Sequence, residues 1–495
     1  MICVSVGRGR HKMLIAEHKH LADHGAELVE LRLDYIRRPV NLKRLMENSP
    51  CPVIATCRRP IDGGKWMRTE EERQVILRTA IANKVDYVDL EMDIAGSIPR
   101  FGSTKRIISY HNFDETPENL QEIHQKIAKL DPDIIKITTM ANNPMDNVRA
   151  LRLCRDSDIP TAAFCMGEMG MNSRILCGRF GSPFTYATFH PERQLAPGQL
   201  SWGEMVKNYN YNQITEKTKI LGVIADPVGH SLSPTIHNAC IRKLGLDMIY
   251  LPFRVPAEYL NEFIAACPEL GIHGLSVTIP HKEKILKCIN ALDDDVVGVR
   301  ACNTIVFKDI NAYGFNTDIS AAVGALKDAT DADNNSETPF AGKQVLILGN
   351  GGVARAIAFG LKKAGGNIVI CGRDSQKAEA LADTVGCKSS IWEDRSTFDA
   401  DIIVNCTPVG MQPNMDESVF EKDWFKKETV VFDTIYNPER TLFIKQAREA
   451  ECQTITGVDM FVRQAAKQFK LFTGHDADVK LMREEVKRAT SAANY

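Results

Sequence analysis

The chain has 495 residues, of which 44% are hydrophobic and 25% charged, which is typical of globular protein and long enough for two to four domains. The formal net charge of −2 and the scattered basic residues give no reason to expect nucleic acid or an anionic membrane as a partner. Fourteen cysteines form no CxxC pair, which argues against disulfides and structural zinc and favours a reducing, cytoplasmic compartment.

The chain begins with a short apolar run and basic residues, too little for a secretory signal or a spanning helix. From residue 1 to about 213, short β-branched runs alternate with amphipathic segments such as 69–85 and 116–130. The expected strands lie at 2–6, 28–35, 52–58, 86–93, 105–111, 133–139, 159–165 and 184–189. Eight βα units predict a closed (β/α)8 barrel over residues 1–213, although 94–104 shows no good helix.

Two polar segments, 208–219 and 327–342, are typical of joints between domains. A second alternation of strands and helices begins after the first joint, and a strong βαβ pattern follows the second. The sequence therefore predicts a substrate-binding part at 219–326 and a Rossmann cofactor part at 340–456.

Glu91, His111 and Lys136 fall near the carboxyl ends of the fourth, fifth and sixth expected strands, the rim on which barrel enzymes assemble active sites. A charged lysine is costly to bury in an apolar strand, so its amine is expected to attack a carbonyl and form a Schiff base. His111 would then remove the acidified proton, with Glu91 holding the imidazole tautomer. The alternative is a structural ion pair of Lys136 with Asp89 or Glu91.

Further residues of this half resemble type I 3-dehydroquinate dehydratase. They are Glu30-Leu31-Arg32, Arg58, Asp62-Gly63-Gly64, Ser109-Tyr110-His111, Thr116-Pro117, Ser173-Arg174, Phe180-Gly181-Ser182 and Ala196-Pro197-Gly198-Gln199. The resemblance implies that Lys136 forms an imine with the ketone of 3-dehydroquinate, that His111 removes the α-proton and returns one to the departing hydroxyl, and that Glu91 orients His111.

The same resemblance makes Arg174 the clamp for the substrate carboxylate, since a guanidinium offers two parallel donors. Further residues that it places around the substrate are Ser5, Glu30, Arg32, Arg58 and Gln199. Two positions depart from the family pattern. Leu195 replaces a usual serine, which removes one substrate hydrogen bond or shifts it elsewhere, and Asp62 replaces a usual glutamate.

The second half opens with GVIADPVGHSLSP at 222–234, which contains Ser231 and Ser233. By itself the serine pair would be a helix N-cap. Other polar groups follow in short motifs: Thr278, Lys282, Asn303 and Asp318. Several donors and acceptors suit a polyhydroxylated acid. A lysine beside an aspartate shuttles the proton that accompanies hydride transfer, and the alternative is a surface ion pair.

An apolar strand then runs into a glycine loop and a helix, which is the setting that a dinucleotide-binding loop requires. The loop is Gly349, Asn350, Gly351, Gly352, Val353 and Ala354. Arg373 and Lys377 follow the next strand, and their charges favour the 2′-phosphate of NADP over NAD. Asp374 weakens this preference unless it caps the next helix.

Together with 405–411, 433–441 and 457–465, these motifs resemble shikimate dehydrogenase along the second half. The resemblance implies that Lys282 and Asp318 are the catalytic pair and that helices at 457–495 return to the substrate part. It assigns shikimate binding to Ser231, Ser233, Thr278, Asn303, Tyr436 and Gln464, and the nicotinamide end to Thr407, Thr434 and Gly457. Gly372 stands where many members have asparagine, which leaves the adenine-ribose contacts open.

Because the dehydratase product, 3-dehydroshikimate, is the reductase substrate, a fused enzyme of chorismate biosynthesis is expected. Three alternatives remain: a second half that prefers quinate with NAD, one inactive domain kept as a scaffold, and a non-catalytic metabolite sensor. Leu195 makes the barrel the candidate for inactivity, whereas intact Lys136 and Lys282 argue against the sensor. The sequence leaves the oligomeric state open.

Overall fold

The computed structural model describes residues 1–229, 231–330 and 336–490. Its internal contacts divide the chain into two compact units, Met1–Ile220 with Leu246–Ala266, and Leu221–Gly245 with Cys267–Tyr495. Within the described ranges, no helix is both long and apolar enough to cross a membrane.

All eight expected strands form one parallel sheet in the first unit. They are β1 (Ile2–Val6), β2 (Leu28–Arg32), β3 (Val53–Thr56), β4 (Tyr87–Glu91), β5 (Lys105–Asn112), β6 (Ile134–Met140), β7 (Thr161–Met166) and β8 (Thr185–Thr188). The order β7-β6-β5-β4-β3-β2-β1-β8 follows the chain around a nearly closed barrel, with β8 paired to β1. The predicted barrel class is confirmed.

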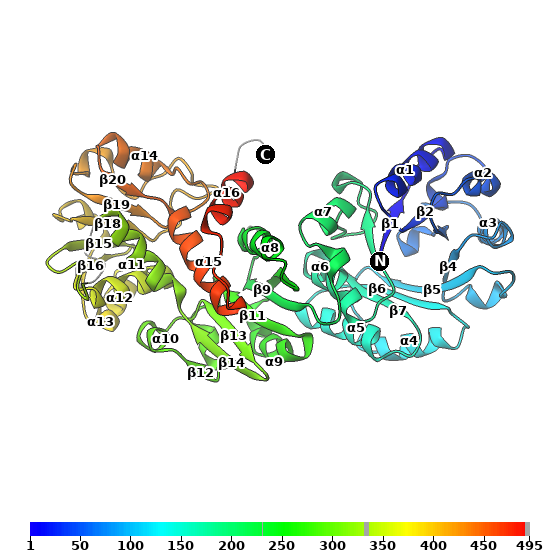
Figure 1. Ribbon diagram of the computed structural model, residues 1–495, viewed down its shortest axis with the longest axis horizontal. Helices are drawn as coiled ribbons and strands as arrows, with labels where there is room; N and C mark the ends of the chain where they lie inside the picture. The colour runs from blue at the N-terminus through cyan, green and yellow to red at the C-terminus, as the bar shows by residue number, and fades with distance from the viewer. Residues whose placement is uncertain (230, 331–335, 491–495) are drawn as a thin grey trace. The chain divides into compact units, whose positions relative to one another are not determined.

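Helices surround the strands of this barrel (Figure 1). They are α1 (His11–Asp23), α2 (Leu42–Met46), α3 (Glu70–Ala82), α4 (Leu120–Ala128), α5 (Pro144–Asp156), α6 (Gly167–Leu176) and α7 (Trp202–Lys207). Thr69 and Glu72 form a capping box that starts α3. Between β4 and β5, where no good helix is expected, the chain forms only the 3-10 turn η3 (Ala95–Ser97).

The second unit contains a mixed sheet that carries the predicted substrate part. Its strands follow one another in the order β9 (Lys219–Ala225), β11 (Ile272–Val277), β13 (Thr304–Lys308), β14 (Asn311–Phe315) and β12 (Ala291–Leu292). The helices of this part are α8 (Ser233–Leu244), α10 (Asp294–Val299) and α11 (Thr317–Ala329). Residues 246–266, with β10 (Met248–Arg254) and the start of α9 (Leu260–Leu270), cluster with the first unit.

A parallel six-stranded sheet follows in the order β17-β16-β15-β18-β19-β20. Its strands are β15 (Gln344–Leu348), β16 (Asn367–Cys371), β17 (Lys388–Ser390), β18 (Ile402–Asn405), β19 (Val430–Asp433) and β20 (Gln453–Ile455). Its helices and those that follow are α12 (Gly352–Lys363), α13 (Ser375–Val385), α14 (Leu442–Glu449), α15 (Gly457–Thr473) and α16 (Val479–Ala489). Because the chain reverses its strand order at β15, a ligand crevice is expected at the carboxyl end of that strand.

The apolar run of β15 is buried on both of its faces. Val345 and Ile347 belong to one hydrophobic cluster, and Leu346 and Leu348 belong to another. Alternate side chains of a strand point to opposite faces, so a strand covered on both sides must be apolar throughout.

The two expected joints differ in structure. Residues 208–219 contain the 3-10 turn η6 (Tyr211–Gln213) and end where β9 begins. The joint at 327–342 begins inside α11, and its residues 331–335 lie outside the described residues.

Candidate active sites

Neighbouring strands of the barrel carry polar side chains at alternate positions. Asp89 and Glu91 lie on β4, Ser109 and His111 on β5, and Lys136 on β6. Strand pairing sets Glu91 beside Ser109 and Ser109 beside Lys136. Since alternate residues share one face of a strand, these side chains all enter the barrel interior.

Asp89 is the anion at the centre of this group. Its Oδ2 accepts from Lys136 Nζ at 2.9 Å and from Arg58 Nη2 at 2.6 Å, and its Oδ1 accepts from Ser109 Oγ at 2.6 Å. Burial raises the pKa of Asp89, but the charges of Arg58 and Lys136 outweigh burial and hold the pKa well below its ordinary value. The ion pair considered as an alternative role for Lys136 is therefore present, and it lies beside a cavity.

Lys136 is only 5% exposed. Its Nζ lies 4.0 Å from the ring centre of Tyr186 and 3.7 Å from Glu30 Oε1. Eight of the residues named from the sequence line the same cavity: Ser5, Glu30, Arg32, Arg58, His111, Lys136, Arg174 and Gln199. Leu195 lines it as well.

His111 contacts an arginine in this structure. Its Nδ1 lies 3.2 Å from Arg58 Nη1. Burial lowers the pKa of His111 well below its ordinary value, and the charges of Arg58 and Lys136 lower it further. The imidazole is therefore neutral at neutral pH and available as a proton acceptor.

Glu91 is not among the described residues that line the cavity. Its carboxylate accepts from Arg73 Nη1 at 2.7 Å and from Arg58 Nη1 at 3.5 Å. Burial raises the pKa of Glu91. Arg58 Nη1 thus contacts both the Glu91 carboxylate and the His111 ring, and among the described residues no hydrogen bond joins Glu91 to His111 directly.

Arg174 is buried with part of its guanidinium unsatisfied. Its Nη1 donates to Tyr186 O at 3.4 Å, and the group lies 4.6 Å from the ring centre of Phe164. Among the described residues, its Nε and Nη2 have no hydrogen-bond partner. Burial lowers the pKa of Arg174 to about 10. A buried donor pair at a cavity wall is the arrangement expected for a missing anionic ligand.

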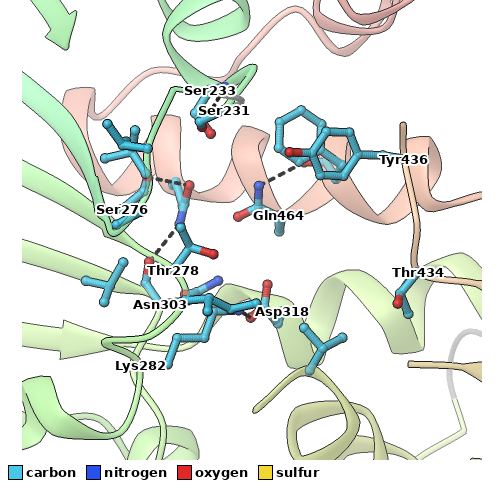
Figure 2. A pocket seen from close by; sticks show the side chains of 18 of the residues that line it. Ser231, Ser233, Ser276, Thr278, Lys282, Asn303, Asp318, Thr434, Tyr436 and Gln464 are labelled. Carbon is cyan, nitrogen blue, oxygen red and sulfur yellow. Dashed lines mark hydrogen bonds and ion pairs between the residues drawn. The ribbon is translucent and has the colours of Figure 1, made fainter. Parts of the chain in front are cut away.

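The second site is a cavity of about 400 Å³ within the second unit. The residues named from the sequence that line it are Ser231, Ser233, Thr278, Lys282, Asn303, Asp318, Val353, Thr434, Tyr436, Gly457 and Gln464. Figure 2 shows the serine pair, Lys282 with Asp318, and Gln464 converging on one space from different elements.

Lys282 Nζ and Asp318 Oδ2 are 2.6 Å apart, with the side chains 12% and 7% exposed. Asp318 lies in the first turn of α11, where the side chain of the cap residue Asn316 accepts from its backbone N–H at 3.1 Å. The pair is thus largely buried at a cavity wall, and the alternative of a surface ion pair does not describe it.

The last long helix contributes a residue that the sequence analysis missed. Gln468 on α15 accepts from Ser276 Oγ at 2.7 Å and donates to Asn303 O at 3.0 Å. Ser276 and Gln468 both line the cavity, as does Phe461, whose ring stacks on Tyr436 at a centroid distance of 4.4 Å. The apolar spacing of α15 predicts its buried face but not which glutamine reaches a neighbouring strand.

The glycine loop leaves space in front of α12. Gly349 has a φ of +118°, and a Cβ at Gly351 would meet nothing within 4 Å. A Cβ at Gly352 would lie 3.7 Å from Lys282 Cδ, so the loop adjoins the catalytic candidate. Open space at the N-terminus of a 12-residue helix suits a pyrophosphate.

Thr407 also lies beside this loop, because its Cγ2 would be 3.3 Å from a Cβ at Gly349. The Oγ1 of Thr434 donates to Asn405 O at 2.9 Å, and the side chain of Asn405 accepts from the backbone N–H of Thr407 at 2.9 Å. One buried asparagine thus connects the two threonines expected at the nicotinamide end.

The strand end after β16 carries the residues expected near the 2′-phosphate. Arg373 is exposed, and Asp374 caps α13 by accepting from the backbone N–H of Lys377 at 3.1 Å. A Cβ at Gly372 would lie 2.7 Å from Asn350 Nδ2, and this amide donates to Asp374 O at 3.1 Å. Gly372 therefore makes room for a loop side chain, and Asp374 acts as the expected helix cap.

Comparison with known proteins divides the chain among four family models. Residues 2–216 match type I 3-dehydroquinase, and residues 223–305 match the shikimate dehydrogenase substrate binding domain. Residues 344–435 match NADP oxidoreductase coenzyme F420-dependent, and residues 457–487 match the shikimate 5′-dehydrogenase C-terminal domain.

Individual relatives agree with these matches. A bifunctional 3-dehydroquinate dehydratase/shikimate dehydrogenase, chloroplastic, of Arabidopsis thaliana is 34% identical over 97% of this chain and 83% of its own length. A shikimate dehydrogenase (NADP(+)) of Methanopyrus kandleri is 41% identical over 55% of this chain and 96% of its own. A shikimate dehydrogenase solved in complex with NADP+ superposes with a TM-score of 0.52 and 37% identity, covering 56% of this chain and 98% of its own.

Proposed function

Since this chain belongs to the family of bifunctional 3-dehydroquinate dehydratase/shikimate dehydrogenases, we propose that its two sites catalyse consecutive steps of the shikimate pathway. The first unit dehydrates 3-dehydroquinate to 3-dehydroshikimate, and the second unit reduces that product to shikimate with NADPH. The observation that supports both assignments is that each cavity is lined by a lysine that pairs with an aspartate, Lys136 with Asp89 at 2.9 Å and Lys282 with Asp318 at 2.6 Å.

In the barrel, Lys136 Nζ attacks the ketone of 3-dehydroquinate and forms an imine with loss of water. The imine acidifies the adjacent carbon, and neutral His111 removes its proton. The hydroxyl group then leaves as water with a proton from His111, and hydrolysis of the imine releases 3-dehydroshikimate and Lys136. Arg174 holds the carboxylate, since its two unsatisfied nitrogens face no protein partner among the described residues.

The remaining barrel residues hold the substrate and orient His111. Ser5 Oγ donates to Glu30 Oε2 at 2.6 Å, so this pair presents one fixed acceptor to a substrate hydroxyl. Arg58 is bonded to Asp89 at 2.6 Å and lies against His111 at 3.2 Å, so it aligns the imidazole beside the imine lysine. We propose that Glu91 orients His111 only through Arg58. Arg32 and Gln199 complete the wall.

In the second unit, Lys282 protonates the carbonyl oxygen of 3-dehydroshikimate as it becomes a hydroxyl, and Asp318 holds the ammonium group at 2.6 Å. Ser231 and Ser233 bind the carboxylate end from the start of α8. Hydroxyl contacts are assigned to Thr278, Asn303, Tyr436 and Gln464, which line the same cavity.

The cofactor of the second unit is NADP(H), which supplies the hydride when bound. The open loop at Gly351 and the start of α12 hold the pyrophosphate, with Asn350, Val353 and Ala354 in the same segment. We propose that Arg373 and Lys377 bind the 2′-phosphate, while Thr407, Thr434 and Gly457 flank the nicotinamide end.

We further propose functional domains at 1–213, 219–326 and 340–456, with 457–495 returning to the substrate part. The ranges of the matched families support these bounds, and α16 packs on α8. Residues 491–495 lie outside the described residues. A cytoplasmic location is proposed on the strength of fourteen free cysteines, whereas the Arabidopsis relative is chloroplastic.

The proposal is tested by adding 3-dehydroquinate to the purified chain, with and without NADPH, and following enone absorbance and NADPH oxidation. Enone formation without cofactor, then NADPH oxidation once it is added, is the expected result. Enone that accumulates beside unused NADPH contradicts the reductase assignment. If neither signal changes, and neither changes after 3-dehydroshikimate is added, both assigned activities are contradicted. Faster oxidation of quinate with NAD than of shikimate with NADP contradicts the substrate assigned to the second unit.

A further inference from the structure

A second cavity of the first unit lies outside the one that contains Lys136. Its volume is about 220 Å³, against about 60 Å³ for the catalytic cavity. It is formed by the carboxyl ends of β1 and β8, the segments that follow these two strands, one side chain of α1, one residue after β2 and one residue in the loop after β3. The residues around it are Ser5, Val6, Gly7, Arg8, Glu17, Tyr35, Lys65, Thr188, Phe189, Arg193, Gln194 and Leu195.

The charged groups of this outer cavity are three cations and one anion. Glu17 Oε1 accepts from Arg8 Nε at 2.6 Å and from Arg193 Nη1 at 2.9 Å, so a single carboxylate serves two guanidiniums. Lys65 Nζ lies 4.5 Å from the ring centre of Tyr35 and has no carboxylate partner among the described residues. The lining therefore has an excess of two positive charges in a chain whose net charge is −2.

The outer cavity adjoins the catalytic cavity. Ser5 and Leu195 line both of them. The hydroxyl of Ser5 donates to Glu30 inside the catalytic cavity, and the backbone N–H of Leu195 donates to Gln199 Oε1 at 3.0 Å. Leu195 is thus an apolar side chain between a cationic outer space and the lysine that forms the imine.

Charge and position together indicate what the outer cavity accepts. The barrel substrate is a small hydroxylated acid, and its destination, Lys136, is only 5% exposed. A cationic cleft with low-dielectric walls raises the local concentration of an anion and speeds its capture. Hydroxyl groups of Ser5, Thr188 and Tyr35 in the same lining suit a hydroxylated ring as well as a carboxylate.

We propose that this outer cavity is a capture subsite, in which Arg8, Lys65 and Arg193 bind the carboxylate of the barrel's hydroxylated substrate before it passes Leu195 to reach Arg174. This inference rests on the dehydratase activity proposed for the first unit. It assigns to Arg193 and Lys65 a role in substrate entry that is separate from imine chemistry.

The test is a single-turnover experiment on the full chain. 3-Dehydroquinate is mixed with excess enzyme, the imine is trapped with borohydride at timed intervals, and the rate of labelling of Lys136 is plotted against enzyme concentration. In Arg193→Gln and Lys65→Gln the half-saturating concentration is expected to rise about tenfold at low salt. The plateau rate, which reports imine formation, is expected to stay unchanged.

Two matched variants separate charge from structure. Arg193→Lys keeps the charge and is expected to restore the half-saturating concentration. Arg100→Gln removes another arginine that is paired with carboxylates of Asp131 and Asp133 and that lines neither cavity, and it is expected to behave as the parent chain. Inorganic phosphate, used as a competing anion, is expected to inhibit the parent more strongly than Arg193→Gln.

Three results would overturn the capture subsite. They are a half-saturating concentration in Arg193→Gln equal to that of Arg100→Gln, a loss that Arg193→Lys does not restore, and a lower plateau with unchanged half-saturation. A parent chain that forms no trapped imine would instead refute the dehydratase function, so the two failures are distinguishable.

Discussion

Lys136 Nζ and Asp89 Oδ2 are 2.9 Å apart inside the barrel, and Arg58 bonds the same carboxylate oxygen at 2.6 Å. Both buried cations therefore share Asp89, while a second carboxylate lies farther from each of them, Glu91 at 3.5 Å from Arg58 and Glu30 at 3.7 Å from Lys136. The ion pair and the catalytic role of Lys136 are compatible, because the pair positions the amine at the cavity wall while the substrate approaches from the cavity side.

Asp89→Asn is expected to destabilise the first unit by about 3–5 kcal/mol, since it leaves Arg58 and Lys136 buried without their shared anion. The loss of dehydratase activity on heating reports thermal unfolding and so measures this destabilisation. Asp131→Asn, at a carboxyl whose side chain is 65% exposed, is the control and should change stability little. Equal stability of the two variants would contradict the central role of Asp89.

Lys136→Ala is expected to lower dehydration by roughly 10⁴-fold or more, because no other amine replaces the imine nucleophile. Reduction of added 3-dehydroshikimate should continue at the parent rate. Lys282→Ala is expected to have the opposite effect. It should lower reduction on the order of 10²–10⁴-fold and leave dehydration unchanged. Loss of both activities in either folded variant would refute two independent sites.

The pH dependence of dehydration follows from His111. Burial, Arg58 and Lys136 lower its pKa, whereas Asp89 opposes them. The neutral imidazole is the base, so acid that protonates it lowers dehydratase activity. The acid limb of kcat/KM for dehydration is therefore expected below the ordinary histidine value of 6.5. An acid limb at or above that value, measured with saturating buffer controls, would contradict this assignment.

Gly372→Asn is expected to weaken NADPH binding, because its Cβ would lie 2.7 Å from Asn350 Nδ2 and displace that amide from Asp374 O. The KM for NADPH should rise several-fold while kcat changes little. Adding Asn350→Gly to Gly372→Asn removes the collision and should recover part of the loss. A double variant worse than either single one would show that the two positions do not share the same space.

The sequence analysis predicts strands well where apolar residues dominate, as in β15 and β6. Gly349 directly follows β15 as expected, whereas Lys136 lies in the first half of β6 and not near its carboxyl end. It does not predict which polar side chains meet across strands. Asp89 shares a face with Glu91 two residues later, so the sequence named both as ion-pair candidates for Lys136, but it did not decide between them or indicate the bond of Asp89 to Arg58.

Side-chain contacts between distant segments were not predicted either, because they form only when the segments pack together. Arg8 and Arg193 meet at Glu17 because β1 pairs with β8. The predicted closed barrel implies that pairing, but no local pattern indicates that these two guanidiniums share one carboxylate. Similarly, Gln468 reaches Ser276 only after α15 packs against β11.

The position of α15 also orders events during synthesis. The barrel strands are all encoded before residue 189, so the first unit has its catalytic groups early in translation. The reductase cavity takes Gln464 and Gln468 from a helix that begins at residue 457. Because domains fold as units from the N-terminus while the chain is made, a nascent or prematurely terminated chain acquires the lysine imine site and lacks a wall of the reductase site.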